Sequence, residues 1–224
     1  MLSGGMLARW INEFQTDPMQ LFISLLIEIP ALLFALILHE ISHGYVALWC
    51  GDGTARMMGR LSLRPSHHLD PIGSLCMVLF GFGWAKPVPI NPRNFRHYVR
   101  DDFFVSIAGI TMNFLLFLIS SFLMVVVWPA SGFMYYIYRF LNTFASINLC
   151  LSLFNLIPFP PLDGFHIVND ILLKGRLRLT RETFIAFQVV FLGLCYFTNI
   201  VTDLLSRVAG SIWNSVISFY VTLL

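Results

Sequence analysis

The sequence predicts an all-α protein that crosses a membrane several times. Of its 224 residues, 57% are hydrophobic and only 12% are charged, whereas a soluble domain is about half apolar and about a quarter charged. The chain therefore has too little charge to cover a globular surface in water, and its mean hydropathy is +0.76. Apolar runs of about 20 residues cross the hydrocarbon core of a bilayer as helices. Because the chain contains several such runs, we expect the lipid bilayer to surround it.

Four regions are candidates for membrane-spanning helices: residues 21–49, 103–128, 133–157 and 184–224. We expect a single integral membrane domain, 1–224, with a three-helix core within residues 21–172 and additional C-terminal helices within residues 180–224. Asp203 and Arg207 interrupt the last apolar region. That region therefore fits either two passes or one pass plus an interfacial helix.

Lysine and arginine collect in three connecting segments, residues 56–64, 86–100 and 174–181, whereas residues 129–132 carry no charge. Cytoplasmic loops hold the excess of these residues in membrane proteins, so we expect the three basic segments in the cytosol. Residues 71–84 must then enter the membrane and return as a re-entrant segment, because both flanks are basic and about 14 residues are too few for a span. The net charge of +2 and the lack of a basic recognition helix argue against a nucleic-acid partner.

Three ionisable side chains, His39, Glu40 and His43, lie near the end of the first apolar run, in "LILHEISHGYVALW". Residues four apart lie on one face of a helix, so the two imidazoles converge. This HExxH arrangement suits a zinc site with two nitrogen ligands and a general base beside them. The motif also occurs by chance, but ionisable groups at membrane depth are costly and usually functional. The pattern therefore predicts a metal centre inside the membrane.

A third ligand is expected from "NLIPFPPLDGFHI", at the end of the third span. Its three prolines cannot continue a helix, and the backbone groups freed by such a break must line a cavity or a polar site. Asp163 directly follows the break and offers a carboxylate oxygen, while His166 competes as a nitrogen ligand. Alone, Asp163 would indicate an ordinary helix start after a proline-rich turn. Opposite a membrane HExxH motif, it is the best third ligand.

These motifs resemble the signatures of the site-2 protease family of intramembrane zinc metalloproteases. Five segments follow the order found in the compact members: "HEISHG", "GDGTARMMGRLSLRPSHHLDPIGS", "GFGWAKPVPINPRNFR", "AGITMNFLL" and "NLIPFPPLDG". The resemblance runs from about residue 31 to about residue 172. It implies that the three-helix core is catalytic, with one zinc ion per chain on His39, His43 and Asp163, and with Glu40 as the general base.

The resemblance also implies a substrate and a location. The expected substrate is a single-pass transmembrane protein or a signal-peptide remnant, cut within the bilayer in regulated intramembrane proteolysis. The expected location is a bacterial or archaeal cell membrane, with the active site toward the cytosolic side. No stretch of the sequence resembles the PDZ-like insertion or the C-terminal regulatory domain that family members often carry. We therefore expect the compact form of the family.

Two amides are candidates for contacting the substrate backbone or the developing oxyanion. They are Asn155, at the helix break, and Asn113, in "GITMN". Fixed donors aimed at developing negative charge stabilise the transition state of acyl transfer. By resemblance both positions are polar in the family, and we assign Asn155 as the better donor. For Asn113, hydrogen bonding between helices beside the small residues Ala108 and Gly109 is an equal alternative.

Residues 56–64 alternate polar and apolar side chains near their end, where Leu61 and Leu63 lie. With Gly59 as a turn, this pattern predicts a short β-hairpin or edge strand at the membrane surface. A substrate that added to this edge as an extra strand would be held extended across the zinc. A basic loop that touches lipid head groups is the alternative.

Two other functions also fit ionisable residues buried in broken helices. A membrane metal-ion transporter uses such residues, but the chain shows no internal repeat and its ligand set matches one hydrolytic site. A catalytically silent binder of membrane segments is the second alternative, and the intact set of ligands and base argues against it. We therefore expect zinc metalloendopeptidase activity.

Overall fold

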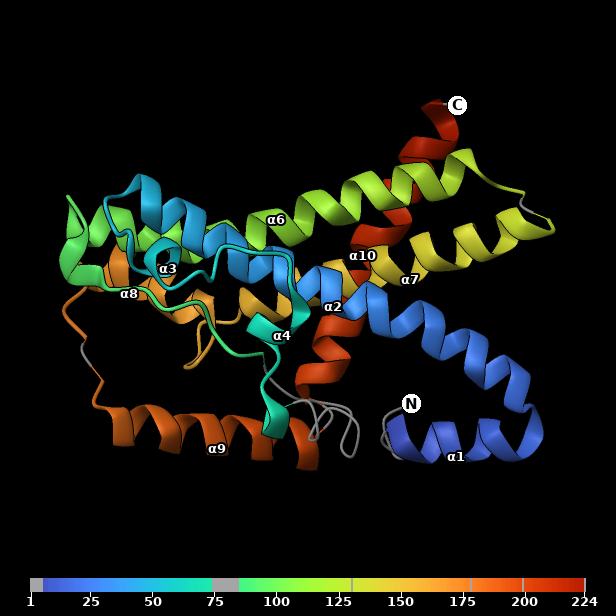
Figure 1. Cartoon of the computed structure of the whole chain (residues 1–224), viewed down its shortest axis with the longest axis horizontal. Helices are drawn as coiled ribbons and strands as arrows, with labels where there is room; N and C mark the ends of the chain where they lie inside the picture. The colour runs from blue at the N-terminus through green and yellow to red at the C-terminus, as the bar shows by residue number, and fades with distance from the viewer. Residues whose placement is uncertain (1–5, 74–84, 130, 178, 199, 224) are drawn as a thin grey trace.

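The computed structural model describes residues 6–73, 85–129, 131–177, 179–198 and 200–223, which are predominantly helical (Figure 1). The helices, in chain order, are α1 (Met6–Thr16), α2 (Pro18–Trp49), α3 (Thr54–Met57), α4 (Pro65–His68), the 3-10 helix η1 (Pro92–Asn94), α6 (Tyr98–Val126), α7 (Phe133–Asn155), α8 (Asp163–Leu173), α9 (Arg181–Phe197) and α10 (Ile200–Leu223). The predicted all-α class is confirmed for the described part of the chain.

The core consists of α2, α6 and α7, which pack along one another, and α8 packs against α6. Each of these three long helices is apolar enough to cross a membrane, which confirms the three predicted core spans. At the contact between α6 and α7, Phe117 is buried against Ala145 and Leu149. Small residues such as this alanine let neighbouring membrane helices approach closely.

The predicted break after the third span is present and positions the next helix. Helix α7 ends at Asn155 and α8 begins at Asp163, because the intervening prolines cannot continue a helix. A Cβ atom at Gly164 would collide with the carbonyl oxygens of Leu156 and Ile157. Glycine therefore allows the first turn of α8, which carries Asp163, to lie directly against the end of α7.

The C-terminal region forms two helices, α9 and α10, which meet at a bend of 73° and are long and apolar enough to cross a membrane only when taken together. If the pair is one broken span, it adds a single pass to the three core spans. Helix α10 packs against α6 and α7, and the Tyr220 hydroxyl donates to the carbonyl oxygen of Leu118 at 3.2 Å. Helix α9 lies apart from the bundle (Figure 1). It meets the connection between α7 and α8 through Phe159, whose ring centre is 5.2 Å from that of Phe191.

The β-hairpin predicted at residues 56–64 is not confirmed, because this fully described stretch contains no strand. The stretch begins inside α3 and turns at Gly59, whose φ is +64°. Leu61 packs against α2 at Gly44, whereas Leu63 is 59% exposed. In the described part of the chain, the β-pairing is an isolated bridge between residues 69 and 85. Most of the predicted re-entrant segment, 71–84, lies outside the described residues.

Candidate metal centre

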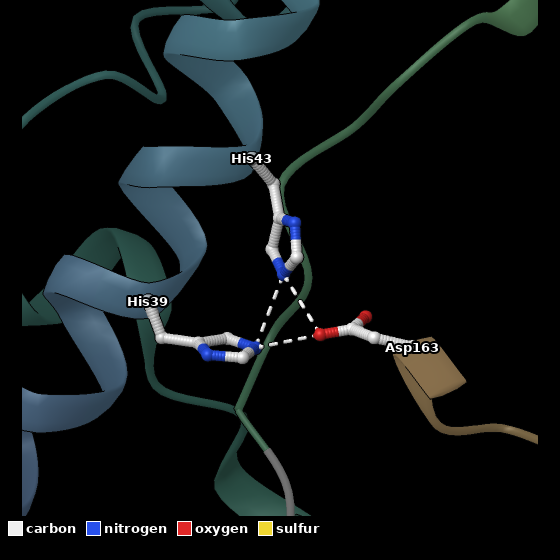
Figure 2. Close-up of side chains that lie close together, drawn as sticks. All are labelled: His39, His43 and Asp163. Atoms are coloured by element: carbon white, nitrogen blue, oxygen red, sulfur yellow. Dashed lines mark hydrogen bonds and ion pairs between the residues drawn. The ribbon is translucent and has the colours of Figure 1, made fainter. Parts of the chain in front are cut away.

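The donor atoms of His39, His43 and Asp163 converge between α2 and α8 (Figure 2). The Nε2 atoms of the two imidazoles are 3.1 Å apart, and each lies 3.3 Å from Oδ2 of Asp163. Each histidine is only 7% exposed. Among the described side chains, this is the group of His, Cys, Asp and Glu residues whose spacing suits a metal ion. The structure thus brings the three predicted ligands together.

A glycine on α6 makes room for the two imidazoles. Gly109 lies so close to them that an added Cβ atom would be 2.5 Å from Cε1 of His39 and 2.5 Å from Nε2 of His43. Non-bonded carbon atoms prefer separations of about 3.5–4.0 Å. Residue 109 must therefore be glycine while the two rings keep these positions. The sequence identified it only as a small residue at a helix interface.

The second nitrogen of each ring is fixed by an acceptor. Nδ1 of His39 lies 2.7 Å from Oδ1 of Asn113, and Nδ1 of His43 lies 2.7 Å from the carbonyl oxygen of Val105. These oxygens only accept hydrogen bonds, so each Nδ1 carries a proton and donates it. In a neutral imidazole this leaves a lone pair on Nε2, the form in which histidine binds metal ions.

The arrangement of these lone pairs fits a metal ion. Both Nε2 atoms face Oδ2 of Asp163, which is buried and receives no hydrogen bond from the described residues. Three electron-rich atoms at this spacing repel one another unless a cation lies between them. Zinc–nitrogen bonds of about 2.05 Å at tetrahedral angles place two nitrogens roughly 3.3 Å apart, close to the separations found here. Three protein ligands leave the fourth position open, as in catalytic zinc sites.

Two buried asparagines behind the site connect three helices. Asn113 on α6 accepts from His39 and donates through Nδ2 to Oδ1 of Asn148 on α7 at 3.1 Å. Asn148 in turn donates to the carbonyl oxygen of Phe144 at 2.8 Å. Of the two roles considered for Asn113, the structure favours the hydrogen bond between helices. Asn148 was not predicted, although an amide inside the apolar run "FASINLCLSLF" was an available signal.

Glu40, the predicted general base, is adjacent to His39 on α2 and lies outside the ligand group. Its Oε2 accepts the backbone N–H of Val88 at 2.8 Å. The segment that carries Val88 is itself fixed, because the Arg60 guanidinium donates to the carbonyl oxygens of Lys86 and Pro87 at 2.9 and 3.0 Å. A loop far along the chain therefore orients the base, and nothing in the sequence indicated that contact.

The remaining candidates make other contacts. Nδ2 of Asn155 donates to the carbonyl oxygen of Leu151, 3.0 Å away in the same helix. His166, the competing nitrogen ligand, directs Nδ1 toward Oδ2 of Asp102 at 3.5 Å and lies outside the ligand group. The group is therefore completed by Asp163 and not by His166.

The chain is similar to curated proteins named as zinc metalloproteases. It is 38% identical over 190 residues to "Putative zinc metalloprotease YwhC" of Bacillus subtilis (strain 168). This match covers 81% of this chain and 85% of that protein. It is 29% identical over 169 residues to "Putative zinc metalloprotease Rip2" of Mycolicibacterium smegmatis. This second match covers 73% of this chain and 63% of that protein. No solved structure matches the chain significantly.

A family model matches the part of the chain that contains the helix break. Residues 130–197, which include Asp163, match the model described as "Peptidase family M50". The similarity to YwhC extends over most of both chains. The resemblance noted in the sequence is thus confirmed, and the chain belongs to peptidase family M50, the site-2 protease family of zinc metalloproteases.

Proposed function

We propose that this protein is an intramembrane zinc metalloprotease, which cleaves peptide bonds within membrane-spanning segments of other proteins. One observation carries the proposal. His39 and His43 are buried side chains of α2, a helix long and apolar enough to cross a membrane. Ionisable residues at such depth mark functional sites, and a metal centre there acts on bonds inside the bilayer.

The chemistry follows from the donor set and the base. A zinc ion held by the three ligands supplies a Lewis acid that polarises the scissile carbonyl and makes water nucleophilic near neutral pH. Glu40 accepts the proton of the attacking water and delivers it to the leaving amine. The hydrogen bond from Val88 N–H to Oε2 holds the carboxylate in place. We therefore assign the proton transfer to Oε1 of Glu40.

Asn155 is the proposed donor to the substrate backbone or to the developing oxyanion. It is the last residue of α7 and lies directly before the break that leads to Asp163. Its hydrogen bond to Leu151 is local, and an exchange of such a bond for one to a substrate carbonyl involves only about 1 kcal/mol. Its position thus supports contact with a substrate and not with the metal.

The proposed substrate is a single-pass transmembrane protein or a signal-peptide remnant in a bacterial or archaeal cell membrane. Helices α3 and α8 and the first turns of α6 lie together at one end of the bundle (Figure 1). The basic segment 56–64 begins in α3, and the basic segment 86–100 ends in the first turn of α6. Because such segments remain in the cytosol, we place the metal centre on the cytosolic side of the membrane.

The test compares cleavage of a membrane-anchored substrate by the purified zinc-loaded protein and by Glu40→Gln. Glutamine cannot accept the proton, so cleavage should fall by about 10²–10⁴-fold at unchanged zinc content. Glu28→Gln removes a carboxylate from the same helix about 18 Å away along its axis and should cleave as the wild type does. Cleavage that survives in Glu40→Gln would refute the mechanism. Zinc transport or substrate capture without cleavage would identify one of the two alternative functions.

A further inference from the structure

A second cluster of titratable side chains joins the ligand-bearing helix α8 to the core. Nδ1 of His166 on α8 lies 3.5 Å from Oδ2 of Asp102 on α6. Asp170, one turn further along α8, is within hydrogen-bonding reach of the same Asp102 carboxyl group. These three residues, here called the acid clamp, include neither a metal ligand nor the proposed base.

Asp170 is a buried carboxyl group without a hydrogen-bond donor. It is only 4% exposed, and no described residue donates to either of its oxygens. A buried carboxylate in this position would lose its hydration without compensation. Its polar neighbour, Asp102, is also an acceptor when ionised, so the two groups can bind each other only when one of them carries a proton. Asp170 and Asp102 therefore share a proton when α8 is docked.

The surroundings favour this proton near neutral pH. Burial, and then the charge of Asp102, raises the pKa of Asp170 from 3.8 to about 7. The hydrogen bond to Asp102 raises the pKa of His166 as well, because the negative charge of the carboxylate stabilises the charged form of the imidazole. The other titratable groups on the first turn of α6, on α8 and on the adjoining turn are Tyr98, Arg100, Asp101, Asp163, Lys174 and Arg176.

We propose that the acid clamp is a proton-dependent positioning device, which holds α8 against α6 while Asp102 and Asp170 share a proton and releases α8 when that proton is lost. Helix α8 packs chiefly against α6, and Asp163 is its first residue, about 10 Å along the helix from Asp170. Release of α8 therefore moves Asp163 away from the two imidazoles. This consequence rests on the proposed function, which takes Asp163 as a metal ligand.

The direction of the pH effect follows from the two states of α8. When α8 is released, Asp170 titrates near its ordinary value of 3.8, and when α8 is docked it titrates at about 7. Between these values the docked form binds the extra proton. The proton of Asp170 therefore makes release easier by up to about tenfold for each unit that the pH rises from about 4 to about 7, and this contribution levels off above that.

Asp170→Asn is the matched variant for the test. Its amide has the shape of the carboxyl group and donates an N–H to Asp102 at every pH, so it reproduces the protonated clamp. The measurement is hydrogen exchange of the α8 backbone amides in the full-length protein without added zinc. The ratio of the wild-type exchange rate to the Asp170→Asn exchange rate should rise by up to about tenfold per pH unit from about pH 5 to about pH 7. Above about pH 7 this ratio should stay constant. The dissociation rate of zinc, divided in the same way, should follow the same profile.

A ratio that stays constant from about pH 5 to about pH 7 would overturn the proposal. Asp102→Asn places the amide on the other side of the pair, so it should also remove the pH dependence of α8 exchange. This variant provides a second test if Asp170→Asn folds poorly. Asp203→Asn removes an exposed carboxylate from α10 and should keep the wild-type profile. Failure of the wild type to bind zinc at any pH would refute the metal site itself, while the exchange profile would still decide on the clamp.

Discussion

Asn113 accepts the Nδ1 proton of His39 across the interface between α6 and α2, over a distance of 2.7 Å. This contact selects the imidazole tautomer whose Nε2 lone pair points toward Asp163. Asn148 extends the connection to α7, so three helices share the orientation of one ligand ring. Outer hydrogen bonds of this kind both orient a histidine and raise its basicity toward a metal.

Replacing Asn113 by alanine should weaken zinc binding by about 10–100-fold, because His39 loses its acceptor and can rotate or change tautomer. Competition with a chelator of known affinity measures this change. Asn113→Asp keeps an oxygen acceptor at the same place and should recover part of the affinity. If Asn113→Ala bound zinc as tightly as the wild type, the positioning role would be wrong.

Replacing Asn155 by alanine should leave zinc binding unchanged, unlike the change at Asn113. Turnover should fall by about 10²–10³-fold, as expected for loss of an oxyanion donor. Zinc content by elemental analysis and cleavage rate at saturating substrate separate the two effects. Loss of zinc from this variant would show that Asn155 supports the metal centre and not the substrate.

Replacing Gly109 by alanine should abolish stoichiometric zinc binding, because the added methyl group occupies the space of both imidazoles. Gly210 on α10 provides a matched control, because a Cβ atom there meets no neighbour within 4 Å. Gly210→Ala should bind zinc normally and gain up to about 1 kcal/mol of helix stability. Equal zinc content in the two variants would refute the close packing at residue 109.

Replacing Asp52 by alanine should lower the stability of the loop that orients Glu40. Asp52 is fully buried after the end of α2, and its carboxylate accepts from Asn91 N–H at 2.7 Å and from Asn94 Nδ2 at 2.8 Å, as well as from Thr54. Leaving these donors unpaired costs about 1–3 kcal/mol each. Faster proteolysis within residues 85–97 and a lower unfolding temperature would show the loss.

The pH dependence of this contribution has a definite sign. Burial opposes ionisation of Asp52, but the hydrogen bonds from Thr54, Asn91 and Asn94 prevail and lower its pKa below 3.8. The stabilisation is therefore present above about pH 4 and is lost only as the pH falls further. Asp52→Ala and the wild type should accordingly converge in stability at strongly acidic pH, and a constant difference would contradict this account.

The long apolar helices could be predicted from composition alone, and their ends only in part. The second core span was expected over residues 103–128, whereas α6 extends over Tyr98–Val126. Its early start is fixed by the Asp101 carboxylate, which accepts the backbone N–H of His97 at 2.8 Å. A cap of this kind is a local polar interaction that hydropathy does not register. The predicted hairpin is not confirmed, since two alternating leucines are too short a pattern to specify a strand, and residues 60–64 form bends and irregular chain.

The candidate site, too, could be predicted from the sequence only in part. His39, Glu40, His43 and Asp163 stand out because each is a polar residue where the surrounding sequence is apolar or broken. The carbonyl oxygen of Val105 cannot stand out, because every residue has one and its role depends on how α6 is rotated against α2. Contacts between helices follow from rotation and register, which no single apolar run specifies.

More than half of the chain lies between His43 and Asp163, and this separation has a consequence for biosynthesis. A ribosome delivers the two imidazoles to the membrane long before it delivers the carboxylate. A nascent chain that has inserted α2, α6 and α7 thus has an incomplete set of ligands. Under the proposed function, catalytic competence therefore awaits completion of α8, and other proteins that pass through the same insertion machinery are spared until synthesis of this helix is finished.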